Sequence, residues 1–407
     1  MNKTPNFSNL NSWMKSYVDH EKFIGSSVLI AVDNKVIHKN HFGFRKKNQL
    51  NPFDFDTVVR IFSMTKPITS LGLMTLEDKG LIDLNSPLSD FIPSFKNCTA
   101  LTEGAKNINE VEEVPSPTLM HLLTHTSGLS YSFNDSLIGR AYSDVMNANN
   151  KKAKNSWPET IATNPALDLE MLCNNLAQFP LSFHPGRKWE YSMSIDVIGR
   201  IIEIVSGKNL SDYLEETIFE PLGMDNTGFS FKNGMEQRLA DCYLKEPEDA
   251  YYKTYLDKPH MYYKENMKLF LGGSGLLSTI TDYFKFTQLI TDQGIYNGSR
   301  IISPTGVQKL TTNMIAKDIA SIGPKEFSFM STVGMGHGLG GSVIVEPQSE
   351  FSSSIGDYSW GGMASTYFWI DRVNQMTTIF FTQLIPSNSY PNRPELKKLV
   401  RNCMDLN

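Results

Sequence analysis

The segments of this sequence that predict β-strands lie near its two ends, and the segments that predict helices lie mainly between them. At the amino-terminal end, apolar runs at 25–32 and 35–38 flank Asp33-Asn34, a pair that favours a hairpin turn. Three further strands are predicted toward the carboxyl end, at 341–345, 365–370 and 376–382, with a turn at 371–374 between the last two. This order predicts a discontinuous sheet domain in which the two ends of the chain pair.

Apolar residues recur at helical spacing in five segments. The predicted helices cover about 9–18, 65–79, 194–205, 281–291 and 392–404. Gly80 ends the second of these, as glycine commonly does. The polar stretch at 97–117 has little periodicity and predicts an insertion or lid-like loop. We expect residues 1–90 and 270–407 to form an α/β sheet domain and residues 91–269 a mostly helical lobe, with a site in the cleft between them.

Composition and charge exclude several classes of protein. Of 407 residues, 40% are hydrophobic and 20% are charged, which is typical of globular chains and not of disordered ones. The net charge of −5 gives no sign of binding to a nucleic-acid backbone. The first residues contain no apolar run of a secretory signal, and no run approaches the roughly 20 apolar residues that would span a bilayer.

Cysteine and histidine spacing gives no sign of a metal site. Cys98, Cys173, Cys242 and Cys403 lie far apart, and the eight histidines show no metal-binding spacing. We therefore expect no metal, no cofactor and no disulfide framework. With the missing export signal, this predicts a soluble, cytoplasmic protein with reduced thiols.

The most specific local feature is Ser63, which precedes Lys66 in an S-x-x-K spacing. Ser12 and Lys15 share that spacing, but they lie within a predicted amphipathic helix, where Lys15 is expected in solvent. Pro67 favours the first turn of a helix because it lacks an N–H. Ser63 is therefore expected at a helix N-terminus, where developing negative charge is favoured. The simpler alternative is a plain N-cap with an exposed lysine.

A serine hydroxyl becomes a good nucleophile only when a base removes its proton. Lys66, about one turn along the same face, is one candidate base, provided that it is desolvated. Tyr191 ends an extended segment just before a predicted helix. It is a second candidate base, which could share the serine proton with Lys66. A half-buried aromatic residue at a helix start is the simpler explanation for Tyr191 alone.

Paired glycines follow Trp360, and they indicate that another group approaches the backbone closely at Gly361 and Gly362. The Met363 N–H at that place would form a two-donor oxyanion hole with the Ser63 N–H. A tight turn or bulge at the start of a strand is the alternative explanation.

In this order, the motifs resemble the serine β-lactamase and penicillin-binding-protein superfamily, and most closely the family VIII carboxylesterases, β-lactamase-like esterases and acyltransferases. Ser63-Met-Thr-Lys66, Tyr191-Ser-Met193 and Trp360-Gly-Gly362 are similar to its three catalytic motifs. The stretches 122–129 and 219–224 are similar to structural markers of the superfamily. The resemblance makes His125 a scaffold residue instead of a base.

The resemblance implies one β-lactamase-like catalytic unit, with an antiparallel sheet, flanking helices and a mostly helical lobe. It implies a serine carboxylesterase that hydrolyses small or short-chain esters through an acyl-enzyme on Ser63. Met193 replaces the usual asparagine and Trp360 removes the cation that would bind a β-lactam carboxylate, so efficient β-lactamase activity is not expected. Alternatives are an acyltransferase using the same acyl-enzyme, a weak β-lactamase or D-amino-acid peptidase-like amidase, and a catalytically silent scaffold.

Several other features have less specific interpretations. Trp360, Trp189 and Tyr131 are candidates to line an apolar acyl pocket with Gly361 and Gly362, or else belong to the core. The glycine-rich stretches 271–275 and 334–338 predict a turn before a helix and a tight or mobile loop. No G-x-S-x-G occurs, which argues against an α/β-hydrolase. The expected partner is a small ester, and the sequence does not predict the oligomeric state.

Overall fold

The computed structural model describes residues 5–147, 167–232, 234–245, 252–254, 267–347 and 353–406. Its main sheet has seven strands in the order β13-β14-β15-β16-β17-β1-β2, and every neighbouring pair is antiparallel. The strands are β1 (Gly25–Val32), β2 (Lys35–Gly43), β13 (Met335–His337), β14 (Ser342–Ile344), β15 (Tyr358–Gly361), β16 (Tyr367–Asp371) and β17 (Met376–Thr382).

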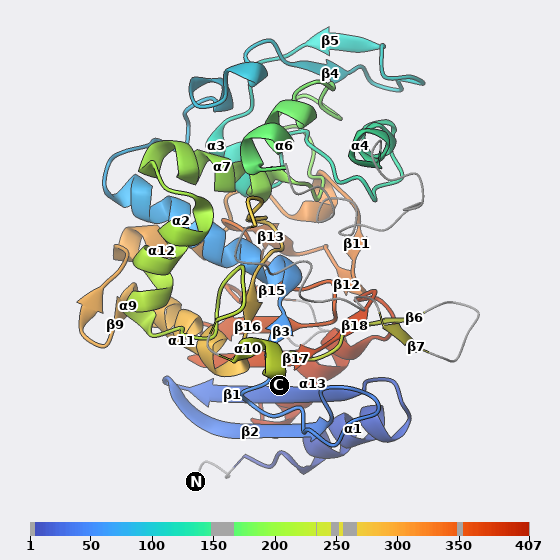
Figure 1. The fold of residues 1–407 in the computed structure, drawn as a ribbon, viewed down its shortest axis with the longest axis vertical. Helices are drawn as coiled ribbons and strands as arrows, with labels where there is room; N and C mark the ends of the chain where they lie inside the picture. The colour runs from blue at the N-terminus through green and yellow to red at the C-terminus, as the bar shows by residue number, and fades with distance from the viewer. Residues whose placement is uncertain are drawn as a thin grey trace.

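The two ends of the chain meet inside this sheet. Strand β1 pairs with β17 from Ser26 opposite Thr382 to Val32 opposite Met376. The predicted pairing of the chain ends is therefore confirmed, and the terminal elements lie together at the bottom of the view in Figure 1.

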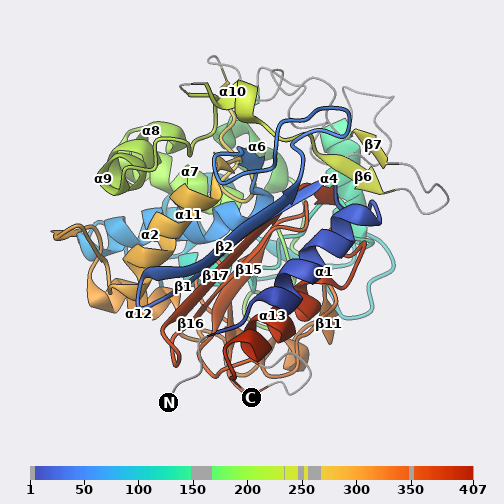
Figure 2. The ribbon, with the colours of Figure 1, turned by 90° about the horizontal axis from the view of Figure 1, so that it is seen from below.

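Strand β1 is apolar from Val28 to Val32, and both of its faces are covered. Val28 and Ile30 pack against α1 (Ser8–Asp19) and α13 (Asn392–Cys403), and Leu29 and Ala31 face the opposite layer. Figure 2 shows α1 and α13 on one side of the sheet and α2, α11 and α12 on the other. A strand buried on both faces has no polar alternation, which is why this one reads as a continuous apolar run.

Helix α2 (Thr65–Asp78) runs through the middle of the molecule. Every residue from Thr65 to Leu76 is buried, as expected for a helix that is enclosed on all sides. Helix α7 (Ser194–Ser206) packs beside it and belongs to the helical lobe in the upper half of Figure 1. The other helices are α3 (Leu119–Leu123), α4 (Leu137–Asn147), α6 (Leu169–Leu176), α8 (Leu210–Leu214), α9 (Glu220–Leu222), α10 (Met235–Arg238), α11 (Ile280–Thr291) and α12 (Pro304–Leu310).

Five small sheets complete the fold. They pair β3 (Val59–Arg60) with β8 (Leu277–Ser278), β4 (Thr99–Leu101) with β5 (Val111–Glu113), β9 (Ile295–Tyr296) with β10 (Ser299–Arg300), β11 (Glu326–Phe327) with β12 (Met330–Ser331), and β6 (Tyr243–Lys245) with both β7 (Tyr252–Thr254) and β18 (Leu384–Ile385). None of the described helices is long and apolar enough to cross a bilayer. The described residues contain no cluster of three side chains able to hold a metal, and all four cysteines are free thiols.

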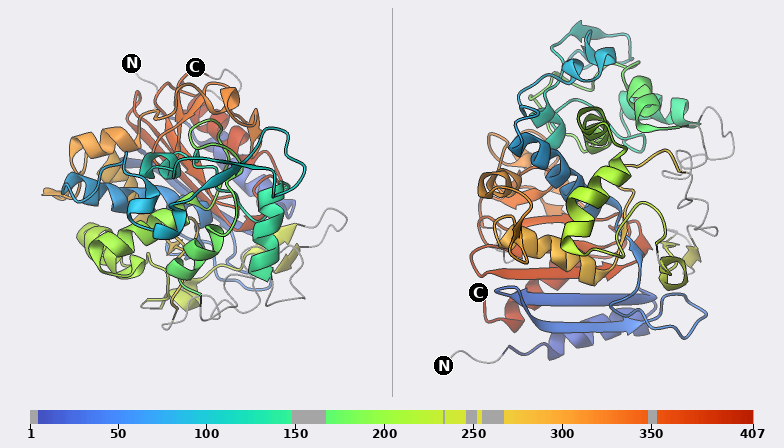
Figure 3. Two further views of the ribbon diagram at one scale, coloured as in Figure 1. Left: turned by 90° about the horizontal axis from the view of Figure 1, so that it is seen from above. Right: turned by 60° about the vertical axis from the view of Figure 1, so that its left-hand side comes forward.

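All five predicted helices are present, with ends that differ by one residue or less. The predicted strand 365–370 begins two residues later and ends one residue later, as β16, and β15 was not predicted at all. The expectation of an irregular loop at 97–117 was wrong in part, because β4 and β5 form a hairpin there, at the top of the view in Figure 3, right. Strand β4 is anchored by buried Ala100, which bridges to Leu181, a contact too distant in sequence to predict. The domain boundaries at 90/91 and 269/270 stay a prediction.

Candidate active site

Ser63 lies in η1 (Phe62–Met64), the 3₁₀ turn that leads directly into α2. Phe62 has a φ of 44°, in the left-handed region that is strained for a bulky side chain. Its ring is buried in a cluster with Ala364 and Ile385, and this packing holds the turn in place. Pro67 is the third residue of α2, where its missing N–H leaves no helical carbonyl without a donor.

Lys66 is fully buried, and all three of its ammonium donors have acceptors. Its Nζ lies 3.2 Å from Ser63 Oγ, 2.9 Å from Tyr131 Oη and 2.7 Å from the Gly273 carbonyl oxygen. Lys15, in the other S-x-x-K match, has a side chain that is 61% exposed and pairs with Asp19 on the same helix. Burial therefore distinguishes the two matches, and only Ser63 has a desolvated lysine beside it.

Tyr191 lies next to Ser63, in the segment just before α7. Its Oη donates a hydrogen bond of 2.6 Å to Ser63 Oγ, and its ring centroid lies 4.6 Å from Lys66 Nζ. Asn134 Nδ2 donates to the Tyr191 carbonyl oxygen at 3.1 Å, and the His125 ring packs against the Tyr191 ring at 4.9 Å. The structure thus brings Ser63, Lys66 and Tyr191 together, with both partners on the serine oxygen.

Tyr131 was expected as a wall of the acyl pocket, but the structure places its hydroxyl on Lys66. Burial raises the pKa of Tyr131 well above its usual value, and the nearby Tyr191 and Asp196 add to that increase. A neutral phenol at this position accepts a hydrogen bond from the ammonium group and orients it. Tyr131 therefore belongs to the polar cluster around Lys66, while its ring stacks on Phe133 at 4.6 Å.

Asp196, which was not predicted, and Gly273, in the predicted turn at 271–275, complete the surroundings of Lys66. Asp196, in the first turn of α7, is fully buried, and its Oδ1 accepts a hydrogen bond of 2.9 Å from the Gly273 N–H. Burial raises the pKa of Asp196 to about 6, while the Lys66 charge acts in the opposite direction. A Cβ on Gly273 would lie only 2.7 Å from Asp196 Oδ2. The glycine-rich turn at 271–275 is thus held against Lys66 by Asp196.

Aromatic side chains form one wall beside the reacting groups. Trp360 lies 5.7 Å from Tyr191 between ring centroids and stacks on Phe327 at 5.8 Å. Trp189 stacks near Tyr191 at 6.3 Å and meets the edge of Phe327 at 5.9 Å. Both indole N–H groups are buried and have no acceptor among the described residues. Trp189 and Trp360 belong to the buried core beside Tyr191, which was one of the two interpretations of the sequence, and an acyl pocket lined by them stays a prediction. Phe327 was missed.

Two buried histidines lie behind this wall. His125 and His337 pack edge to face at 5.4 Å. The Ser192 N–H donates to His125 Nδ1 at 3.3 Å, and His337 Nδ1 donates to the Gly338 carbonyl oxygen at 2.7 Å. Burial lowers the pKa of both, that of His337 to about 4. They are neutral side chains that support Tyr191 and Trp360, and His337 lies in strand β13 instead of the predicted loop.

The backbone at Gly362 comes close to the turn that carries Ser63. A Cβ on Gly362 would lie 2.4 Å from the Ile61 carbonyl oxygen, so the predicted close approach is present. The Met363 side chain packs against the cluster that contains Phe62. The Met363 N–H has no acceptor in the part of the chain that the structure describes. The oxyanion hole formed by the Met363 and Ser63 N–H groups stays a prediction.

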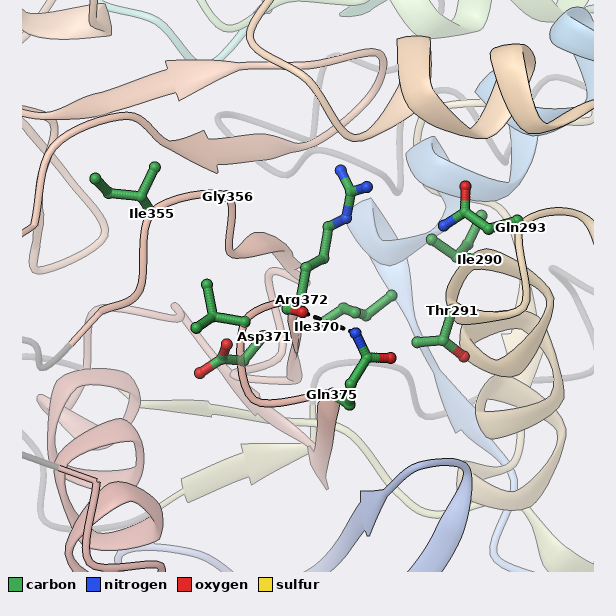
Figure 4. Close-up of a pocket in the computed structure, with 10 residues that line it drawn as sticks. Ile290, Thr291, Gln293, Ile355, Gly356, Ile370, Asp371, Arg372 and Gln375 are labelled. Atoms are coloured by element: carbon green, nitrogen blue, oxygen red, sulfur yellow. Dashed lines mark hydrogen bonds between the residues drawn. The ribbon is translucent and has the colours of Figure 1, made fainter.

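A surface cavity of about 300 Å³ lies away from these residues, at the turn between β16 and β17 (Figure 4). Its polar groups are engaged in local contacts: Gln375 donates to the Arg372 carbonyl oxygen at 2.9 Å, and Asp371 pairs with Arg401 at 3.1 Å. A second cavity of about 350 Å³ lies between β2 and α11. Among the residues that line them, neither cavity contains a nucleophile hydrogen-bonded to a base.

Three comparisons place the chain among known proteins. A family model described as Beta-lactamase matches residues 10–401. Acyltransferase calJ of Penicillium decumbens is 29% identical over 368 residues, which cover 86% of this chain and 80% of that protein. Esterase EstB of Burkholderia gladioli is 24% identical over 377 residues, which cover 89% and 86%. The structure of EstCE1, a hydrolase with promiscuous acyltransferase activity, has a TM-score of 0.75 at 23% identity and covers 96% of this chain and 97% of that one.

Proposed function

Because this chain belongs to the Beta-lactamase family, we propose that it is a serine carboxylesterase that cleaves small or short-chain esters through an acyl-enzyme on Ser63. The observation that carries the proposal is the contact of Ser63 Oγ with both Lys66 and Tyr191. Relatives named as an esterase and as acyltransferases match most of the chain, which supports an acyl-transferring enzyme.

In the first half of the reaction, Ser63 Oγ attacks the ester carbonyl carbon while its proton passes to the Lys66–Tyr191 pair. The carbonyl electron pair moves to the oxygen, which the Ser63 and Met363 N–H groups hold. When the tetrahedral intermediate collapses, the bond to the alkoxy oxygen breaks and the pair returns a proton to the departing alcohol. Water then attacks the acyl-enzyme with the same pair as base, and the acid leaves.

The contacts of Lys66 favour Tyr191 as the proton acceptor within this pair. The three acceptors around Lys66 Nζ match the three donors of an ammonium group. A charged Lys66 stabilises the phenolate form of Tyr191, whose ring centroid lies 4.6 Å from Nζ.

The aromatic wall beside Ser63 favours substrates with a small apolar acyl group. Trp189, Trp360 and Phe327 offer ring surface beside Ser63, and Trp360 offers no positive charge to a β-lactam carboxylate. Weak β-lactam or D-amino-acid amide cleavage would therefore be a side reaction, because a charge-assisted hydrogen bond contributes about 1.5–3 kcal/mol that this wall does not provide.

A second candidate function is acyl transfer to an alcohol or amine. The relatives that carry the names acyltransferase calJ and monacolin J acid methylbutanoyltransferase favour it. The acyl-enzyme is common to both functions, so the partition between water and another acceptor decides between them. A silent scaffold is disfavoured by the complete set of Ser63, Lys66 and Tyr191.

Initial rates on p-nitrophenyl acetate, butyrate and octanoate test the proposal. Ser63→Ala is expected to lower kcat by roughly a thousandfold or more, whereas Ser12→Ala, in the solvent-exposed S-x-x-K match, is the control and should keep the wild-type rate. A mass increase equal to the acyl group, lost in Ser63→Ala, would identify the intermediate. Product diverted from acid to a new ester by added alcohol would favour the acyltransferase. Retention of the wild-type rate by Ser63→Ala would overturn the assignment.

A further inference from the structure

Arg393, near the start of α13, is a buried cation that no step of the proposed reaction uses. Its Nη2 donates hydrogen bonds to the Gly362 carbonyl oxygen at 2.7 Å and to the Thr366 carbonyl oxygen at 3.3 Å. Its guanidinium also lies 5.6 Å from the centroid of the Tyr367 ring. The side chain therefore reaches from the carboxyl-terminal helix to the backbone that follows β15.

The carbonyl that Arg393 binds belongs to the same peptide unit as the Met363 N–H. That peptide is trans, so its C=O and N–H bonds point in opposite directions. The guanidinium group on the carbonyl side, together with the Ser365 N–H that donates to the same oxygen at 3.2 Å, fixes the plane of the peptide and turns its N–H away from α13. The other neighbour of this backbone is the turn at Ile61, which leads to Ser63.

Arg393 has no carboxylate partner among the described residues, although it is only 6% exposed. Burial lowers the pKa of Arg393 to about 10, so the group keeps its positive charge at neutral pH. A buried charge without a counter-ion is costly to fold, which makes a purely stabilising role a poor explanation for it. In contrast, Lys397 and Arg401 on the same helix pair with Asp357 and Asp371.

The two glycines after Trp360 leave the space that this arrangement needs. A Cβ on Gly361 would lie 2.5 Å from the Arg393 guanidinium, and a Cβ on Gly362 would meet the Ile61 carbonyl oxygen. One glycine thus admits the cation and the next admits the turn that carries the nucleophile. A side chain at either position would therefore collide, at Gly361 with Arg393 and at Gly362 with the turn at Ile61.

We propose that Arg393 is a positioning residue of the oxyanion hole, which holds and polarises the Gly362–Met363 peptide so that its N–H meets the developing oxyanion. This inference rests on the proposed function. A charge-assisted hydrogen bond to a peptide carbonyl increases the positive character of the N–H at the opposite end of the same dipole. The effect is greatest in the transition state, because the charge on the substrate oxygen is greatest there.

Arg393→Gln and Arg393→Lys, with Arg401→Gln as the matched control on α13, test the inference. We expect Arg393→Gln to lower kcat by about tenfold to a hundredfold with KM within about twofold of wild type, below the effect of deleting an oxyanion donor. Arg393→Lys keeps the charge and should recover part of the rate. Arg401→Gln loses an ion pair and should reduce thermal stability while leaving kcat unchanged. Rates are compared on the plateau of each pH profile.

Inhibition by a trifluoromethyl ketone, which forms a tetrahedral adduct on serine, separates positioning from a general loss of structure. Its Ki should rise in Arg393→Gln by the same factor by which kcat/KM falls. The inference is overturned if Arg393→Gln behaves like Arg401→Gln, or if only KM changes. If Arg393→Gln does not fold, the changes in Ki and kcat/KM of Arg393→Lys are compared with those of Arg401→Gln instead. If only the role of Arg393 is wrong, Ser63→Ala is still inactive. If the proposed function is wrong, Ser63→Ala keeps its activity.

Discussion

The hydroxyl of Tyr191 donates a hydrogen bond of 2.6 Å to the hydroxyl oxygen of Ser63, although 128 positions of the chain separate the two residues. Ser63 is held by a turn beside the sheet, and Tyr191 by the start of a helix in the upper lobe. Their contact therefore depends on how these two parts of the fold pack against each other.

Tyr191→Phe should lower kcat on p-nitrophenyl butyrate by about a hundredfold to a thousandfold, because it removes only the oxygen that contacts Ser63. KM and the far-UV circular dichroism spectrum should change little. Tyr213→Phe is a matched control, since it removes a buried hydroxyl that contacts Thr75, outside the site. Equal rates for Tyr191→Phe and wild type would exclude Tyr191 from the proton transfer.

Tyr131→Phe should lower kcat/KM by about tenfold to a hundredfold, since hydrogen bonds to charged groups contribute about 1.5–3 kcal/mol. The change removes one of three acceptors around Lys66 and leaves the aromatic ring in place. Phe133→Leu alters the ring stacked on Tyr131 and keeps the hydroxyl, so it serves as the control. If both variants lose activity equally, packing and not the hydroxyl determines the effect.

Asp196→Asn should stabilise the fold at pH 7 while lowering the rate. The pKa of Asp196 is about 6 in the folded protein against 3.8 without burial, so its favourable contribution is present below pH 3.8 and lost as pH rises to 6. Asparagine removes that loss, and the free energy of unfolding at pH 7 should rise by about 1–3 kcal/mol, measured by urea titration. The rate should fall because the negative charge near Lys66 is gone, and a variant that keeps full activity would contradict this role.

His337 should destabilise the fold in mild acid. Its pKa falls from 6.5 to about 4 on folding, so its contribution to stability is present above pH 6.5 and lost as pH decreases toward 4. The loss amounts to about 3 kcal/mol and opposes the trend from Asp196 in the same range. His337→Asn, which keeps a donor for the Gly338 carbonyl, should show a smaller decrease in unfolding free energy between pH 7 and 4.5 than wild type. Identical pH dependence in the two proteins would contradict the assignment.

The sequence predicted the parts of this molecule that depend on local patterns. The apolar run at 25–32 and the helix at 65–79 have clear periods, and the S-x-x-K match at Ser63 is distinguished by Pro67. Strands of three residues, such as β4, are too short to show a period, and their pairing depends on distant partners like Leu181.

The supporting residues of the site could not be predicted in the same way. Asp196 is a carboxylate on an otherwise apolar helix face soon after Tyr191, which was a usable signal, but its contact with Gly273 spans 77 positions. Tyr131 was assigned to a pocket wall because aromatic residues are common there, and only the fold shows its hydroxyl on Lys66. In the sequence, Arg393 looks like any cation of an amphipathic helix, and only the packing of α13 shows its contact with Gly362.

The pairing of β1 with β17 has a consequence for synthesis of the chain. Thr382 Oγ1 donates to the Gly25 carbonyl oxygen across 357 positions, so the ribosome must complete almost the whole chain before β1 gains its second neighbour. At 5–20 residues per second, that delay is on the order of 20 to 70 s. During this time the edge of β1 that pairs with β17 in the folded protein has no partner strand, and an unpaired strand edge of this kind is prone to aggregation.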